Sequence, residues 1–184
     1  MLVKDFIVAR ITYSECKEFC QHWHYSKTCP PGKYYFGLYN TTNLIGVMCY
    51  GTPAMRHQKD CYKVDLELRR LCCIDNTPKN TESFFIGKTL KILKNIGIKR
   101  VLSLADPNYG HQGTIYKASN FKLLGEEQGG GSRDIYIDGV KMHSRTAFAK
   151  YGASGQKKLS ALLPNSVVQV KNKIRKLVYV YNIK

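Results

Sequence analysis

One stretch of the chain, from Leu102 to Gly125, limits the fold more than any other part of the sequence. It begins within an apolar run, Val101–Ala105, which is short enough to be a strand that is buried on both faces. Asp106 follows directly, and a turn rich in glycine leads into a short predicted helix from Thr114 to Asn120. Open α/β sheets bind their ligands at the carboxyl ends of such strands. The stretch therefore predicts an α/β protein with its site after this strand.

Two side chains of this stretch are candidates for proton transfer. Asp106 is expected at the carboxyl end of the strand, and Tyr116 returns over it from the helix, so the two could share a proton. The alternative is structural: Asp106 caps the turn, and Tyr116 packs in the core with its hydroxyl bonded. Spacing alone leaves both interpretations open.

Charge is the strongest signal in the composition. The 184 residues include 29 Lys and Arg against 13 Asp and Glu, a formal net charge of +16, whereas a small domain usually carries about 2–8 charges of net excess. Such an excess attracts a polyanion, and nucleic acid is the expected partner, although a merely soluble basic surface is the alternative. The sequence shows neither a membrane span nor a signal peptide, so we expect a cytoplasmic protein without membrane contact.

The cysteines favour reduced thiols over a disulfide framework, because seven is an odd count and Cys72 and Cys73 are adjacent. Three of them, Cys16, Cys20 and Cys29, lie within fourteen residues together with two histidines. Their helical spacing and the absence of a Cys-x-x-Cys pair favour burial in the core over a zinc site. We therefore predict no metal ligands here, with His24 as the one candidate for a metal contact.

The order of predicted elements resembles the acetyltransferase (GNAT) fold. The prediction is a single domain over residues 1–184, an α/β structure with a central mixed sheet flanked by helices and a basic C-terminal segment from about 153 to 184. The helices are expected from a cap at Ser14 to Trp23, from a cap at Asn80 or Thr81 to Gly97, and over 145–151, with an irregular loop over 51–59. The strands are expected over 4–12, 34–39, 44–50, 63–74, 101–105, 121–124, 134–137 and from 176 onward, with a bulge at Arg69-Arg70 and a glycine loop at 129–131.

Proteins with that fold hold the pyrophosphate of acyl-coenzyme A on helix amides, usually through a glycine-rich turn. The corresponding residues here, Lys79 to Phe84, contain no glycine, and Glu82 would repel a pyrophosphate. Ser83 could still bind an anion or a substrate. The alternative is that Glu82 and Ser83 simply cap the helix.

Several short motifs together resemble the Mom family of phage DNA-modification proteins, over about His24 to Gly152. They are Glu67-Leu-Arg-Arg70-Leu, Asn80-Thr-Glu82-Ser83, Ser103-Leu-Ala-Asp106, Gly110-His111-Gln-Gly113, Tyr116-Lys-Ala-Ser-Asn120-Phe and His143-Ser-Arg145. The resemblance implies a GNAT-like transferase that adds a carbamoylmethyl group to the exocyclic amine of adenine in DNA and so shields phage DNA from restriction. It implies catalytic roles for Arg70, Ser83, Asp106 and Tyr116. Substrate contacts are expected from the other matching polar residues: His24, Tyr25, Asn80, Glu82, His111, Asn120, His143 and Arg145.

The chemistry of adenine agrees with these roles. Its exocyclic amine is a poor nucleophile, so transfer needs a proton acceptor, for which Asp106 is the candidate, while Tyr116 relays a proton or orients the base. Arg70 either clamps an anionic group or only contacts a phosphate or an ion-pair partner. Because the amine lies within the duplex stack, we expect the adenine to be flipped out onto an aromatic ring, for which Tyr25, Tyr34, Tyr35, Phe36 and Tyr109 are the candidates.

The partners follow from charge and from the resemblance. Double-stranded DNA is the expected partner, held by phosphate contacts from Lys157, Lys158, Lys171, Lys173, Arg175 and Lys176, unless these form a solvated charge run. The donor is open between acetyl-coenzyme A and an aminoacyl-tRNA, and an iron ion and a homodimer are open as well. Two other functions compete: a GNAT acyltransferase for an amine of tRNA, protein or a small molecule, and a nucleic-acid-binding protein that has lost catalysis.

Overall fold

The computed structural model describes residues 3–128 and 133–183, and the chain divides into two compact units. The first comprises Met1–Ala105, Gly113–Gly125 and Val178–Lys184, and the second comprises Asp106–Gln112 and Glu126–Leu177. The expectation of a single domain stays a prediction. The predicted glycine loop at 129–131 lies outside the described residues.

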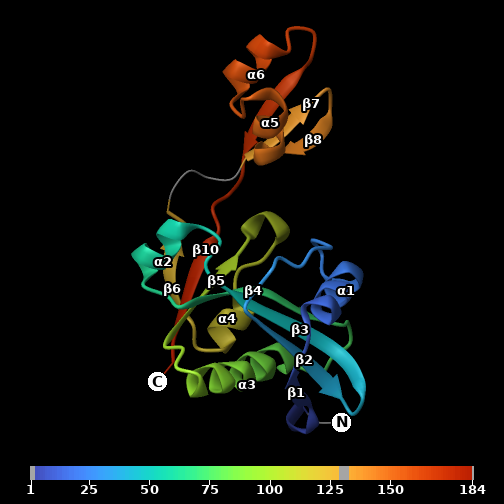
Figure 1. The fold of residues 1–184 in the computed structure, drawn as a ribbon, viewed down its shortest axis with the longest axis vertical. Helices are drawn as coiled ribbons and strands as arrows, with labels where there is room; N and C mark the ends of the chain where they lie inside the picture. Colours follow the sequence, from blue (N-terminus) through green and yellow to red (C-terminus); the bar gives the residue numbers. More distant parts are fainter. Residues whose placement is uncertain (1–2, 129–132, 184) are drawn as a thin grey trace. The chain divides into compact units, whose positions relative to one another are not determined.

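The first unit is built on a mixed sheet of seven strands in the order β1-β2-β3-β4-β5-β10-β6 (Figure 1). The strands β1 to β4 pair antiparallel, and β4 pairs parallel with β5. This confirms the mixed sheet and the return of the final strand into it. The bounds are Ile7–Arg10 (β1), Tyr34–Asn40 (β2), Asn43–Gly51 (β3), Leu66–Cys73 (β4), Arg100–Ala105 (β5), Lys122–Glu126 (β6) and Leu177–Asn182 (β10).

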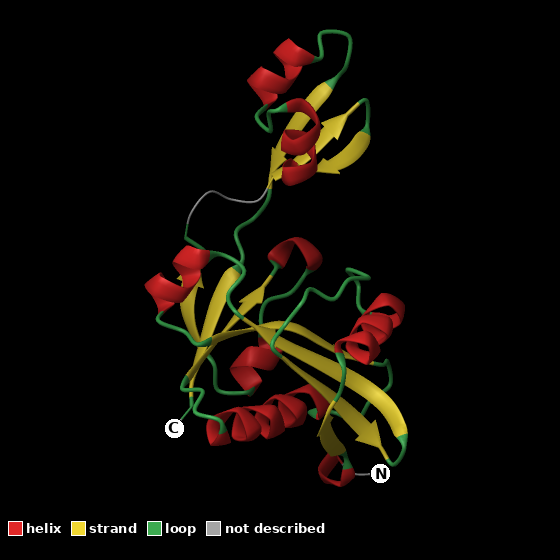
Figure 2. Cartoon of the chain, in the orientation of Figure 1, coloured by secondary structure: helices red, strands yellow, loops and turns green. Residues whose placement is uncertain are grey.

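Helices α1 (Tyr13–Trp23) and α3 (Thr81–Asn95) cover opposite faces of this sheet (Figure 2). Neighbouring residues of a strand point to opposite faces. Val47 and Cys49 of β3 pack in one cluster with α1, whereas Tyr50 contacts Thr89 of α3 through a 2.8 Å hydrogen bond between the hydroxyls. The predicted stripe of α3, which includes Ile86, Leu90 and Leu93, is buried as expected.

Two expectations about local structure were wrong. The cap of α1 is Thr12 rather than Ser14: its hydroxyl accepts a hydrogen bond from the Glu15 amide, and the Glu15 carboxylate binds the Thr12 amide in return. The polar segment 51–59 was expected to be an irregular loop throughout, but α2 (Arg56–Tyr62) begins within it. Short helices rich in polar residues carry little periodic signal, so tertiary contacts decide them.

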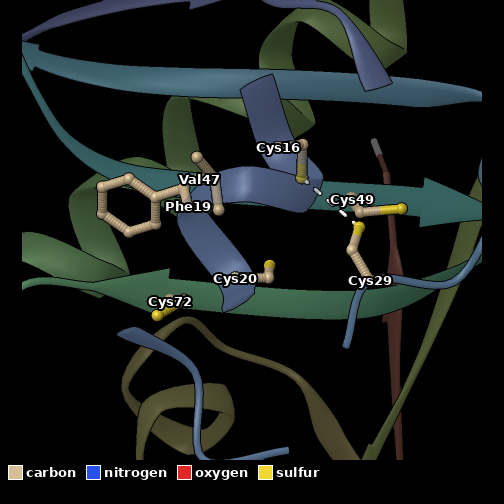
Figure 3. Packing of buried hydrophobic residues seen from close by; sticks show 7 residues of the cluster. All are labelled: Cys16, Phe19, Cys20, Cys29, Val47, Cys49 and Cys72. Carbon is tan, nitrogen blue, oxygen red and sulfur yellow. Dashed lines mark hydrogen bonds between the residues drawn. The ribbon is translucent and has the colours of Figure 1, made fainter. Parts of the chain in front are cut away.

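Five of the seven cysteines lie in one buried cluster between α1 and the sheet (Figure 3). They are Cys16, Cys20, Cys29, Cys49 and Cys72, with Phe19 and Val47 among them. All seven cysteines of the chain are free thiols in the structure. Burial of these small apolar side chains agrees with the helical spacing of Cys16 and Cys20.

The second unit has its own sheet, in the order β8-β7-β9, formed by Val140–His143, Arg133–Ile137 and Val168–Asn172. Its core gathers Ile135, Ala147, Leu159 and Val168, from the strands and from helices α5 (Ser144–Tyr151) and α6 (Gln156–Leu162). Strand β9 and helix α6 were not predicted from the sequence. The remaining helical segments are Val3–Asp5 (η1), Pro107–Tyr109 (η2) and Thr114–Ala118 (α4). None of the described helices has both the length and the apolar character needed to cross a membrane.

Candidate active site

A bulge in β4 places two arginines at the middle of the sheet. Cys49 pairs with Arg70 and Tyr50 pairs with Leu68, so Arg69 is the extra residue between the two pairs. This confirms the bulge that the broken alternation predicted. A bulge bends its strand and changes the direction of the side chains that follow. Both arginine side chains here reach toward the loop that follows α1.

The Arg70 guanidinium donates three hydrogen bonds, two of which hold that loop. Its Nε donates to the carbonyl of Thr28 at 2.9 Å, its Nη2 donates to the Thr28 hydroxyl at 3.2 Å, and its Nη1 donates to the carbonyl of Arg69 at 2.7 Å. The Arg69 guanidinium in turn donates to the carbonyl of Pro31. Hydrogen bonds from a charged donor are stronger than neutral ones. The structure therefore shows Arg70 positioning this loop on β4.

The loop carries His24 and Tyr25 next to each other. The His24 ring is buried, and its Nδ1 accepts a hydrogen bond from the Ser26 amide at 3.1 Å and contacts the Ser26 hydroxyl at 2.8 Å. An Nδ1 that accepts from an amide carries no proton, so the neutral ring has its proton on Nε2. The Tyr25 ring lies 4.3 Å from the His24 ring, and 52% of its surface is exposed.

The strands β4 and β5 are paired from Leu66 and Val101 up to Leu68 and Ser103. Ser103 is fully buried at the end of this ladder, and its hydroxyl donates to the carbonyl of Leu68 at 3.4 Å. The hydroxyl of Tyr116 hydrogen-bonds to the Ser103 side chain. Helix α4 therefore brings Tyr116 to the place where the paired part of β4 and β5 ends.

The surroundings of Tyr116 keep its phenol protonated. Burial raises the pKa of Tyr116 above its ordinary value; the hydrogen bond with Ser103 opposes this, the charges of Tyr25 and Glu67 add to it, and Arg70 acts against it. The net direction is upward, so the phenol keeps its proton at neutral pH. These effects also show that the loop, β4 and α4 meet around one hydroxyl.

Aromatic contacts fix the position of the Tyr116 ring. The ring lies 5.4 Å from Tyr179 of β10 and 5.6 Å from Phe121, both in tilted geometry. Gly113 begins α4 with a φ of +70°, and its Cα lies against the Tyr179 ring. Only glycine fits there, because a Cβ would overlap the ring and because φ is positive.

A second group of predicted residues lies along α3. Asn80, Ser83 and Asn120 line a groove of about 780 Å³ bounded by α3, the end of α4 and the end of β10. Three lysines, Lys4, Lys91 and Lys94, line it as well. The Ser83 hydroxyl donates to the Asn80 carbonyl at 3.0 Å, which is the capping role considered from the sequence. The structure thus places Ser83, Asn80 and Asn120 in the lining of the same groove.

Asp106 and His111 belong to the second unit. The Asp106 carboxylate accepts from the amide of Asn108 at 3.0 Å and from its side chain at 2.7 Å, and so it caps η2. The His111 amide donates to the Asp106 carbonyl at 3.3 Å. The Asn108 side chain also bonds to both backbone groups of Ile174. These contacts correspond to the turn-capping role that was the structural alternative for Asp106. The role of Asp106 in proton transfer stays a prediction.

His143 and Arg145 are linked at the start of α5. The His143 side chain caps that helix, and its Nδ1 accepts from the Arg145 amide at 3.1 Å. Both side chains are exposed. A helix cap is a structural role, so substrate contact by either residue also stays a prediction.

The predicted basic segment divides among several elements. Lys157 and Lys158 lie on α6, and Lys171 lies on β9 with its ammonium over the Tyr136 ring. Lys173 pairs with Asp134 at 3.2 Å, while Arg175 and Lys176 precede β10. An ammonium in an ion pair is less available to bind a phosphate, so Lys173 is a weaker candidate for a phosphate contact than the other five basic residues of this segment.

Comparison with known proteins identifies the family of this chain. The model of the Mom protein family matches residues 5–184. This chain belongs to the Mom protein family. A curated relative, the methylcarbamoylase mom of Escherichia phage Mu, is 28% identical over 182 residues, which are 94% of this chain and 74% of that protein.

Solved structures show the fold of this Mom family member. The protein yncA of Salmonella typhimurium, solved with its cofactor acetyl-CoA, aligns with a TM-score of 0.55 at 6% identity, over 97% of this chain and 94% of that one. A GNAT-family protein of Desulfovibrio desulfuricans aligns with a TM-score of 0.53 at 9% identity, over 97% and 99%. The GNAT fold predicted from the order of elements is confirmed.

The turn before α3 does not fit the pyrophosphate of acetyl-CoA in this Mom protein. Asn80 has a φ of +72° and leads into a first turn that contains the Glu82 carboxylate. A negative charge in the first turn of a helix opposes the binding of phosphates by the helix amides. The Thr81 amide and hydroxyl are already bonded to the Pro78 carbonyl.

Two residues of the site were missed as functional candidates, although both lie in the quoted motifs. Glu67 is a buried carboxylate that accepts from the Ala54 amide at 2.8 Å and lies 3.7 Å from the Arg69 guanidinium. Ser103 supplies the hydrogen bond to Tyr116. A charged residue at a buried strand position was the available signal for Glu67, because carboxylates are seldom buried without a role.

Proposed function

We propose that this chain is a phage DNA-modifying enzyme that transfers a carbamoylmethyl group to the exocyclic amine of adenine in double-stranded DNA. Membership of the Mom family, the relative named as a methylcarbamoylase and the transferase fold support it. The observation that carries the proposal is the Tyr116 hydroxyl, protonated and hydrogen-bonded to Ser103, among residues of β4 and the loop after α1.

The flipped adenine stacks on Tyr25. This ring is half exposed, rests against His24 and acts electrostatically on Tyr116, so a base stacked there lies beside the proton donor. Stacking of a base on an aromatic side chain contributes about 1–3 kcal/mol. Arg70 contributes by holding the loop that presents Tyr25, which makes it a positioning residue.

The reaction replaces one proton of the amine by the transferred group. The nitrogen bonds to the transferred carbon, one N–H proton leaves to a carboxylate, for which we propose Asp106, and the bond from that carbon to the donor breaks. The leaving group takes the proton of Tyr116. The raised pKa keeps the phenol protonated before this step, and because it also makes the phenol a weaker acid, the transfer requires a strongly basic leaving group.

The donor is anionic and carries no coenzyme A pyrophosphate on the α3 turn, since Glu82 opposes it. We propose a polyanionic donor in which the carbamoylmethyl carbon is bonded to the leaving group, which agrees with the net charge of +16 and with the lysines of the α3 groove. Attack on the ester carbonyl of an aminoacyl-tRNA would instead give an aminoacyl amide. His24 Nδ1 is hydrogen-bonded to Ser26, so an iron ion at His24 would bind through Nε2. The steps proposed above do not use a metal.

Mass spectrometry of nucleosides tests the proposal. DNA from cells that express the wild-type chain contains a modified deoxyadenosine whose added mass is that of the carbamoylmethyl group. With Tyr116→Phe the product falls by about 10²- to 10⁴-fold, the usual contribution of a general acid, while Tyr39→Phe on β2 leaves it unchanged. Unmodified DNA with soluble, folded wild-type protein in the phage's own host contradicts the proposal and favours an acyltransferase for another amine.

A further inference from the structure

Three thiols converge between α1 and the loop that follows it. Cys16 and Cys20 lie one turn apart on α1, and Cys29 arrives from the loop. Their sulfur atoms all lie within 4.8 Å of one another, and those of Cys16 and Cys29 are 3.6 Å apart (Figure 3). All three are buried. The mechanism proposed above uses none of them.

The spacing of these sulfurs suits a shared metal ion. Thiolates bound to Zn²⁺ at about 2.3 Å in a tetrahedron lie about 3.8 Å apart. The 3.6 Å between Cys16 and Cys29 is close to that edge, and it is far longer than the roughly 2.05 Å of a disulfide. The thiols are therefore placed to share an ion.

A fourth thiol stands beside them. Cys49 of β3 belongs to the same buried cluster, contacts Cys29 and lies 3.8 Å from the Pro30 carbonyl. Gly32 lets the loop approach this sulfur, since a Cβ on Gly32 would come within 2.5 Å of it. Cys49 is not among the three sulfurs that all lie within 4.8 Å of one another, so it completes a tetrahedron when its side chain turns toward them from β3.

The charge around the loop also suits such a site. A divalent ion with four thiolates carries two excess negative charges. Two guanidiniums, Arg69 and Arg70, bind the loop on either side of Cys29, at Pro31 and Thr28. Simple packing of buried cysteines does not need these charges.

We propose that Cys16, Cys20, Cys29 and Cys49 bind one Zn²⁺ ion in a closed structural site. Thiolates select Zn²⁺ over hard cations such as Mg²⁺. The ion fixes the loop to α1 and β3, and so it holds Thr28 where Arg70 binds it and supports the loop that carries Tyr25. The proposal does not depend on which group the enzyme transfers.

The test is the metal content of the full chain, purified under reducing conditions without chelators. Elemental mass spectrometry finds about one zinc ion per chain, the stoichiometry of a closed four-cysteine site. Replacement by Co²⁺ produces sulfur-to-cobalt charge-transfer absorption and the intense visible bands of a tetrahedral ion. Cys61→Ser alters an exposed cysteine outside the cluster and serves as the matched control, which keeps both signals.

Substitution of a ligand weakens the site strongly. Loss of an outer partner alone costs about 10- to 100-fold in metal affinity, so Cys29→Ser lowers cobalt affinity by at least about 100-fold. Wild-type protein that binds neither zinc nor cobalt, or that contains a Cys16–Cys29 disulfide without metal, overturns the proposal without any variant. A cobalt spectrum unchanged in Cys49→Ser overturns the four-cysteine ligand set.

Discussion

Replacing Gly113 by alanine separates the position of Tyr116 from the stability of the fold. Gly113 begins α4 with a φ of +70°, and a Cβ there would overlap the buried Tyr179 ring and come within 2.7 Å of its hydroxyl. The same ring packs on Tyr116. Any movement that relieves the overlap therefore moves the proton donor.

The expected loss of stability has two parts. A left-handed conformation costs an alanine about 1–2 kcal/mol relative to glycine, and forcing atoms into a packed core costs about 1–3 kcal/mol. Gly97 ends α3 with a φ of +85° and has open space at its Cβ, so Gly97→Ala reports the first part alone. Gly113→Ala should destabilise by about 2–5 kcal/mol.

Urea unfolding followed by circular dichroism measures both variants, and nucleoside mass spectrometry measures their products. We expect Gly113→Ala to reduce DNA modification by about 100-fold at a temperature where it is still folded, because a shift of about 1 Å at a catalytic group has that effect. Gly97→Ala should keep full activity. Equal free energies of unfolding for the two variants, or full modification by Gly113→Ala, would refute the packing argument.

Three further predictions concern stability and DNA binding. Tyr50→Phe removes a buried hydroxyl bonded to Thr89 and should cost about 1 kcal/mol, a fall of roughly 2–4 °C in melting temperature by calorimetry; an unchanged melting temperature contradicts it. Burial raises the pKa of Asp134, but hydrogen bonds from its two lysine partners outweigh this and lower it. Asp134 therefore stabilises the fold above the unfolded pKa near 3.9, and this contribution is lost as pH falls through the folded pKa. Thermal unfolding from neutral to acidic pH should show the loss in wild type and not in Asp134→Asn, and identical curves would argue against it. The double substitution of Lys157 and Lys158 by alanine should reduce the slope of log affinity against log salt by up to about 2; an unchanged slope in DNA-binding titrations would remove both from the phosphate contacts.

Local patterns in the sequence predicted most elements of the first unit. The apolar run before Asp106 and the stripe of α3 are periodic signals that any buried strand or helix must carry, and both were confirmed. The break at Arg69-Arg70 predicted the bulge for the same reason, since an extra residue disturbs a period of two. Strand β9 was missed because its lysine-rich surroundings resembled a solvated tail.

The candidate site was only partly accessible from the sequence. Motif resemblance gave Tyr116 and Arg70, but it did not show that Arg70 holds Thr28, which is 42 residues away. Nor did it show that Ser103 bonds to Tyr116, because each depends on how distant segments meet.

By itself the sequence determined the α/β class, the mixed sheet, the basic charge and the family, since periodicity, composition and short motifs are local properties. Tertiary structure decided which side chains share a site. The raised pKa of Tyr116 comes from burial and from charges on separate elements. The cysteines gather because α1, a loop and β3 pack together. Contacts between residues far apart in sequence leave no periodic signal, and so only the folded chain reveals them.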